Sequence, residues 1–123
     1  MALIFVGVGL VFFAALAGIV LASCRLIRRR MPRWLLAAHP VAGISGLTCL
    51  WVAFGLWSGA RDLPFDAGIL ALSFAFVGGI FLFSLRATRL PRPFFAVALH
   101  GAAALFGCAL LIVGLLRVSG TAV

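Results

Sequence analysis

The chain has 123 residues, of which 66% are hydrophobic and 10% charged, with a mean hydropathy of +1.32 and a formal net charge of +8. A soluble domain carries roughly a quarter charged residues, and a chain this short cannot bury so much apolar surface in one core. This composition excludes a soluble globular domain. It predicts an all-α membrane protein that forms a single membrane domain over residues 1–123.

Four apolar stretches predict four membrane spans, at about residues 2–24, 34–57, 67–85 and 94–116. Each is close to the roughly 20 residues that a helix needs to cross the hydrocarbon of a bilayer. Backbone groups in lipid must satisfy their own hydrogen bonds, so each stretch is expected to be a helix. The sequence therefore predicts a four-transmembrane-helix bundle with short connections and the lipid bilayer as its surroundings.

The three connections differ in charge, and this difference predicts the orientation. The first contains five arginines and no acid, and the third contains three arginines and no acid, whereas the middle one offsets Arg61 with Asp62 and Asp66. Positively charged loops stay in the cytoplasm. We therefore expect a multi-pass protein of the bacterial cytoplasmic (inner) membrane, with cytoplasmic first and third connections and periplasmic termini. Nucleic acid is not an expected partner, because no folded basic module accompanies the charge.

The two halves of the sequence align without a gap when one is shifted by 61 positions. The matched residues include both histidines, basic residues of the connections, a proline and several small residues: His39 with His100, Arg25 with Arg86, Arg28 with Arg89, Pro32 with Pro93, Gly7 with Gly68, Ala14 with Ala75, Gly18 with Gly79, and Gly46 with Gly107. Apolar composition alone does not readily produce these matches. We expect two tandem, parallel helical-hairpin repeats, residues 1–61 and 62–123, related by a pseudo-two-fold axis along the membrane normal. The small residues before each basic connection are expected to serve close helix packing.

His39 and His100 are the only histidines or charged residues within the four predicted spans. Such side chains are costly in lipid and usually face the interior of a bundle. The repeat places both at equal depth, roughly 9–10 Å from the basic connections at 1.5 Å per residue. Two imidazoles that approach the axis from opposite sides can hold a haem iron between them. The sequence thus predicts one haem b, with His39 and His100 as axial ligands of the iron.

Neighbouring residues extend this hypothesis. The small residues four and seven positions after each histidine would leave space for the macrocycle, namely Gly43, Gly46, Ala104 and Gly107. Phe95 and Phe106 would pack against its edges. Haem propionates need cationic partners, and the arginines expected in this role are Arg28, Arg33, Arg89 and Arg92.

A structural role for the histidines is the main alternative. A buried histidine can donate to a carbonyl group, or bridge two helices through a hydroxyl group such as that of Ser45 or Thr48. Duplication would copy a structural histidine as faithfully as a ligand. Contact with a quinone, another metal and proton handling are further alternatives for the same pair.

The repeated unit consists of a span, a connection with arginine and proline, and a histidine followed by small residues. Over the whole chain it resembles small uncharacterised inner-membrane proteins of proteobacteria, a resemblance that implies no particular activity. The histidine pair and its small neighbours also resemble four-helix b-type cytochromes, as an analogy of architecture.

Catalytic motifs are absent from the sequence: it contains no Ser-His-Asp set, P-loop, dinucleotide fingerprint or zinc-ligand spacing, so we do not expect an enzyme. We expect a b-type cytochrome-like electron-transfer subunit, with a quinone as one candidate partner. The alternative is a cofactor-free accessory subunit of a larger respiratory or photosynthetic complex, since little of the chain lies outside the bilayer. The sequence leaves homo-oligomers open. Transport is a third alternative, although no carboxylate lies within a span.

Overall fold

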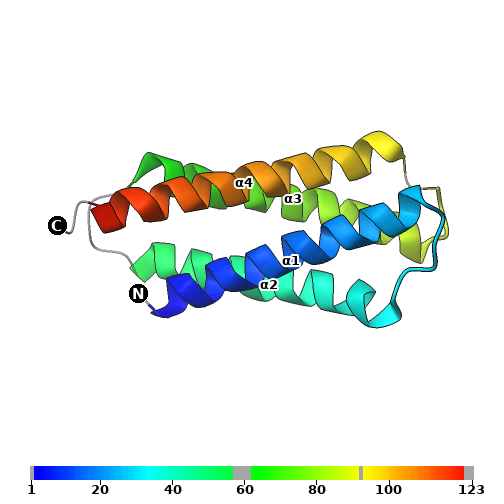
Figure 1. Ribbon diagram of the computed structural model, residues 1–123, viewed down its shortest axis with the longest axis horizontal. Coiled ribbons are helices and arrows are strands. Elements are labelled where there is room, and N and C mark those ends of the chain that lie inside the picture. Colours follow the sequence, from blue (N-terminus) through cyan, green and yellow to red (C-terminus); the bar gives the residue numbers. More distant parts are fainter. Residues whose placement is uncertain (1, 57–61, 92, 121–123) are drawn as a thin grey trace.

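Four long helices make up the protein. The computed structural model describes residues 2–56, 62–91 and 93–120, and their side chains up to Arg117. The helices are α1 (Ala2–Leu26), α2 (Arg33–Leu56), α3 (Leu63–Ala87) and α4 (Phe94–Gly120) (Figure 1). Each is long and apolar enough to cross a membrane, with a hydropathy between 1.6 and 2.8 over its most apolar part. The expected all-α bundle of four candidate membrane spans is confirmed.

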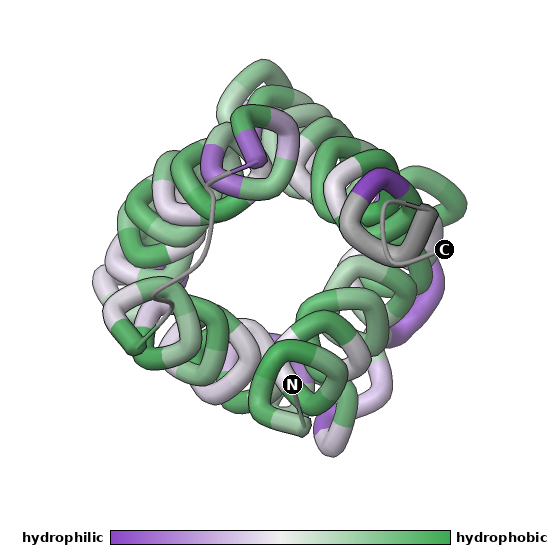
Figure 2. The backbone as a smooth tube through the Cα atoms, turned by 90° about the vertical axis from the view of Figure 1, so that its left-hand side faces the viewer, coloured by the Kyte–Doolittle hydropathy of each residue, from purple (hydrophilic) through white to green (hydrophobic). Residues whose placement is uncertain are grey.

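The helices are arranged as two hairpins, α1–α2 and α3–α4. Contacts are extensive within each hairpin and sparser between hairpins, where α1 meets α4 and α2 meets α3. Seen along the bundle, the four helices stand at the corners of a square (Figure 2). Helices α2 and α4 are therefore diagonally opposite. We refer to the two contacts between hairpins as the α2/α3 seam and the α1/α4 seam.

Five of the helix ends extend beyond the predicted apolar stretches, namely the starts of α2 and α3 and the ends of α1, α3 and α4. Helix α3 begins at Leu63 instead of residue 67, since Pro64 lies in its first turn, where a missing amide hydrogen costs nothing. Arg25 and Arg86 lie in the last turns of α1 and α3, where a positive charge is favourable beside the negative end of the helix dipole. Membrane helices tolerate arginines near their ends because such long side chains can reach out of the hydrocarbon.

Helices α1 and α3 end with the same backbone geometry. Arg28 and Arg89 adopt left-handed backbone conformations with φ of 53° and 59°. The amide of Arg29 donates to the carbonyl oxygen of Cys24 at 2.8 Å, and the amide of Leu90 makes the corresponding bond at 2.9 Å. This pattern is a Schellman motif, which usually has glycine at the left-handed position. Here an arginine occupies that position in both hairpins.

Glycines bring the two helices of each hairpin close together. A Cβ atom added to Gly7 would lie 3.1 Å from the carbonyl oxygen of Gly46, and one added to Gly68 would lie 3.0 Å from that of Gly107. Small residues at such positions let membrane helices approach closely. Backbone contact of this kind explains the strong pairing within each hairpin.

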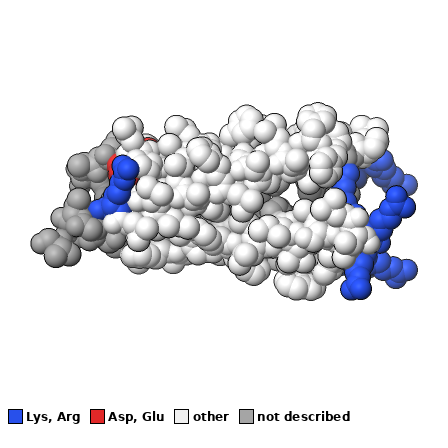
Figure 3. All heavy atoms as spheres, turned by 45° about the horizontal axis from the view of Figure 1, so that its top comes forward, with Lys and Arg blue, Asp and Glu red and all other residues white. Residues whose placement is uncertain are grey.

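Charge and hydrophobicity divide the molecule along its length. Among the described residues, arginines gather at the end that carries the α1–α2 and α3–α4 connections (Figure 3). Large apolar side chains are exposed on all four helices, including Phe5, Trp34, Phe83 and Phe106. A protein in water would bury such side chains, so this surface is suited to lipid. We call the charged end the arginine-rich end.

Candidate functional site

The structure brings together the two residues that the sequence predicts as ligands. The imidazole rings of His39 and His100 have their centres 6.0 Å apart, with their planes at 85°. Both rings are half-buried. Since α2 and α4 are diagonally opposite, the rings meet inside the bundle and do not point outward to lipid.

A backbone carbonyl group holds a hydrogen on Nδ1 of each ring. His39 Nδ1 lies 2.8 Å from the carbonyl oxygen of Ala14 on α1, and His100 Nδ1 lies 2.8 Å from that of Ala75 on α3. A carbonyl oxygen only accepts hydrogen bonds, so each Nδ1 must donate its hydrogen. In a neutral imidazole the other nitrogen, Nε2, then carries a lone pair. Metal-binding histidines are commonly oriented in this way, by a hydrogen bond from the nitrogen that does not bind the metal.

Gly18 and Gly79 make room for the two rings. A Cβ atom added to Gly18 would lie 3.1 Å from His39 Cε1, and one added to Gly79 would lie 3.1 Å from His100 Cε1. The sequence marked these glycines only as positions for helix packing. Gly18 and Gly79 lie one turn after Ala14 and Ala75, and a residue four positions later lies on the same helix face. This spacing was the only sequence signal that the glycines lie beside the histidine rings.

Two of the four small residues predicted to clear space for haem contact the neighbouring helix of their own hairpin. A Cβ atom on Gly46 would lie 2.9 Å from the carbonyl oxygen of Gly7, and one on Gly107 would lie 2.7 Å from Leu72 Cγ. Both glycines are buried. The space left by their missing side chains is therefore taken by α1 and α3.

The other predicted neighbours lie in more open surroundings. A Cβ atom on Gly43 would meet nothing closer than Ala14 Cβ at 3.8 Å. Ala104 is half-buried. Phe95 and Phe106 are 71% and 61% exposed, so these rings lie on the outer surface of the bundle.

Three of the four arginines predicted to pair with propionates lie at the arginine-rich end. Arg28, Arg33 and Arg89 are exposed there, and Arg92 is outside the described residues. Arg33 is the first residue of α2. It precedes His39 by six residues, which corresponds to about 9 Å along a helix.

The site consists of the two imidazoles themselves. Within the described ranges, no three His, Cys, Asp or Glu side chains lie together in a way that could hold a metal ion. Thr48, considered from the sequence as a partner for a histidine, donates to the carbonyl oxygen of Ile44 at 2.8 Å. The histidines therefore use main-chain acceptors on the neighbouring helix.

No protein-family model matches this chain, and no curated protein or solved structure does either. The chemistry of a fold resides in its site, and here that site is the pair of histidines.

Proposed function

We propose that this protein is a b-type cytochrome-like electron-transfer subunit of the bacterial inner membrane, with one haem b between His39 and His100. One observation carries the proposal. Two imidazoles from diagonally opposite helices have their ring centres 6.0 Å apart, and each has Nδ1 bonded to a main-chain carbonyl group, which leaves Nε2 with a lone pair.

The spacing of the rings fits a shared metal centre. An ion bound linearly to one nitrogen of each ring, at about 2 Å from each nitrogen, places the ring centres roughly 6 Å apart. A haem iron would supply one-electron exchange at this position. With both His39 and His100 holding it, such an iron would be suited to electron transfer more than to binding of small molecules.

The protein's own groups would orient and balance this centre. The carbonyl groups of Ala14 and Ala75 hold the imidazole planes through their bonds to Nδ1. Gly18 and Gly79 accommodate the rings. In this proposal Gly43 and Ala104 leave space beside the histidines. Guanidinium groups pair well with carboxylates, and the arginines proposed for the propionates are Arg28, Arg33, Arg89 and Arg92.

The proposal includes a tandem duplication of residues 1–61 as residues 62–123. It is supported by contacts that recur at an interval of 61 residues, including the histidine–alanine bond at 2.8 Å in both hairpins and the left-handed arginine after α1 and α3.

The arginine-rich end would face the cytoplasm and the chain ends would face the periplasm, because basic connections are retained inside.

The test is an optical spectrum of the detergent-purified protein from cells supplied with ample haem. We expect the reduced-minus-oxidised bands of a low-spin haem b, and we expect their loss in His39→Ala and in His100→Ala. Ser84→Ala is a matched control, because its hydroxyl donates to Ile80 on the exposed surface of α3. It should retain the bands.

A second variant separates ligation from a structural role. In His39→Gly, added imidazole should enter the space of the missing ring and restore the bands, which a purely structural histidine would not allow. Colourless wild-type protein would refute the haem proposal. If such colourless protein also co-purified with a large membrane complex, the accessory-subunit alternative would replace it.

A further inference from the structure

The connection between α1 and α2 carries two arginines that the other hairpin lacks. At the 61-residue interval, Arg29 is replaced by leucine and Arg30 by proline. The α3–α4 hairpin nevertheless ends in the same backbone geometry at the same end of the bundle. Neither Arg29 nor Arg30 is therefore required by the hairpin end that both halves share. The haem proposal does not use them either, because neither is one of the arginines proposed for the propionates.

The two guanidinium groups are available to a ligand from outside the protein. Arg29 and Arg30 are exposed, and their side chains make no hydrogen bond or ion pair with any residue that the structure describes. Figure 3 shows the arginines of this end beyond the apolar body of the bundle. The two acidic residues of the chain, Asp62 and Asp66, precede and begin α3, at the opposite end. A ligand of the arginine pair must therefore be an anion that the chain itself does not supply.

Main-chain geometry holds the pair beside the end of α1. The amide of Arg29 donates to the carbonyl oxygen of Cys24 at 2.8 Å, directly after the left-handed Arg28. Arg30 is the next residue and lies three positions before the start of α2 at Arg33. A residue adds at most about 3.6 Å to an extended chain, so neither side chain starts far from a helix end.

Exposed apolar side chains on both sides place the pair at the surface of the bilayer. Leu26 and Ile27 are exposed just before it, and Trp34 is exposed just after it. Tryptophan is enriched at the boundary between hydrocarbon and headgroups. The headgroup layer is about 5–8 Å thick on each side of the hydrocarbon, so arginines between these residues lie in it or next to it. The anions within reach there are the phosphates of phospholipids.

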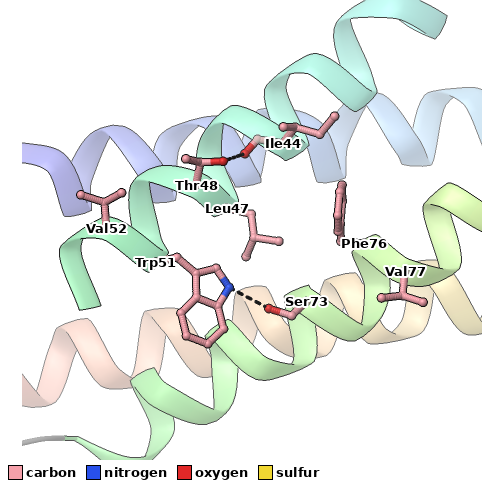
Figure 4. A pocket seen from close by; sticks show the side chains of 8 residues that line it. All are labelled: Ile44, Leu47, Thr48, Trp51, Val52, Ser73, Phe76 and Val77. Carbon is pink, nitrogen blue, oxygen red and sulfur yellow. Dashed lines mark hydrogen bonds between the residues drawn. The ribbon is translucent and has the colours of Figure 1, made fainter. Parts of the chain in front are cut away.

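The α2/α3 seam gives a lipid no comparable polar contact. Its groove is lined mainly by apolar side chains, together with the hydroxyl groups of Thr48 and Ser73 (Figure 4). Each hydroxyl donates to a carbonyl oxygen four residues earlier in its own helix, at 2.8 Å and 2.9 Å. Contacts of lipid with this seam are therefore those of acyl chains, and recognition of a charged headgroup belongs to an end of the bundle. Among the described residues of the opposite end, Asp62 and Asp66 outnumber Arg117.

We propose that Arg29 and Arg30 bind the headgroup of an anionic phospholipid, such as phosphatidylglycerol, in preference to a zwitterionic one. Their guanidinium groups donate to the phosphate oxygens, since the planar fork of arginine matches the geometry of phosphate. The acyl chains of the lipid lie along Leu26, Ile27 and Trp34. A zwitterionic lipid also has a phosphate, but its cationic group is repelled by the other arginines of this end. This binding goes beyond the proposed function and does not depend on haem.

The experiment measures lipid binding to the detergent-purified, delipidated protein by native mass spectrometry, which resolves each bound lipid by its mass. Phosphatidylglycerol and phosphatidylcholine with the same acyl chains are added separately. We expect the first phosphatidylglycerol to bind about five- to thirtyfold more tightly than the first phosphatidylcholine, as one or two arginine contacts imply.

Variants locate the site. Arg29→Gln and Arg30→Gln should each reduce the preference for phosphatidylglycerol about three- to fivefold, and the double variant should abolish most of it. Arg86→Gln is the matched control, because it removes one charge from the last turn of α3 at the same end. It should retain most of the preference. Arg117→Gln removes a charge from the last turn of α4 at the opposite end and should leave the preference unchanged.

The outcome is independent of the haem proposal. Colourless protein that prefers phosphatidylglycerol would refute only the haem, whereas haem-containing protein without this preference would refute only the lipid site. Equal binding of the two lipids, or a full preference in the double variant, would overturn the inference. An equal loss in Arg86→Gln and Arg29→Gln would overturn it as well, since the charge of the whole end would then attract the lipid without a particular role for the pair.

Discussion

The two hairpins share their internal contacts but differ in the seams between them. Within each hairpin, a histidine bonds to an alanine carbonyl oxygen at 2.8 Å and lies against a glycine whose added Cβ would stand 3.1 Å from the ring. The α2/α3 seam has a tryptophan–serine hydrogen bond of 3.0 Å, whereas its counterpart places isoleucine and phenylalanine at those positions. Inside a hairpin the two helix backbones approach closely, so substitutions at these contacts are poorly tolerated. The contacts in the seams are sparser, which leaves room for the side chains there to differ.

The largest expected effect concerns the close approach inside each hairpin. Gly46→Ala and Gly107→Ala place a methyl group 2.9 Å and 2.7 Å from atoms of the neighbouring helix. Overpacking of this kind costs about 1–3 kcal/mol, so both variants should lower the free energy of unfolding in mixed detergent micelles by this amount. Gly55→Ala and Gly101→Ala are the controls, since nothing lies within 4 Å of their added Cβ atoms. A cost in one hairpin only would show that the two are not packed alike.

A smaller effect is expected where glycine contacts imidazole. Gly18→Ala and Gly79→Ala place a methyl group 3.1 Å from a histidine Cε1, so each ring must move by a few tenths of an ångström. We expect a cost of about 1 kcal/mol or less together with a reduced yield of the haem bands in both variants. Gly78→Ala is the adjacent control, because its nearest neighbour, His100 Cβ, stands at an ordinary 3.7 Å. Haem yields that fell as far in Gly78→Ala as in Gly79→Ala would contradict a specific role for the glycine at the ring.

The sequence predicted the four helices and the approach of the two histidines for a clear physical reason. Lipid removes the option of irregular backbone, so apolar length translates almost directly into helices. A register that aligns His39 with His100 also places both at the same depth, and a polar ring at that depth is driven inward. The helix ends were less predictable, since Pro64 and the terminal arginines extend helices beyond their apolar stretches.

The parts that were not predicted depend on rotation of the helices and on main-chain groups. Gly46 shares the face of His39, as the spacing indicated, but that face packs against α1, so the space beside the glycine is filled. The carbonyl groups of Ala14 and Ala75 carry no side-chain signal of their hydrogen bonds.

The smallest expected effect tests the left-handed arginines, where the two hairpins agree. A residue with a Cβ atom pays roughly 1–2 kcal/mol in this conformation, and glycine offsets part of that gain through its greater freedom when unfolded. Arg28 and Arg89 have φ of 53° and 59°. Arg28→Gly and Arg89→Gly should therefore raise the free energy of unfolding, by less than about 1 kcal/mol. Arg28→Ala removes the same charge but retains the strained backbone, so it should give no such gain.

If arginine occupies these positions because its charge pairs with haem propionates, haem yield should fall equally in the glycine and alanine variants while only the glycine variants become more stable. A stability loss in Arg28→Gly would instead mean that the guanidinium group holds the end of α1 in place.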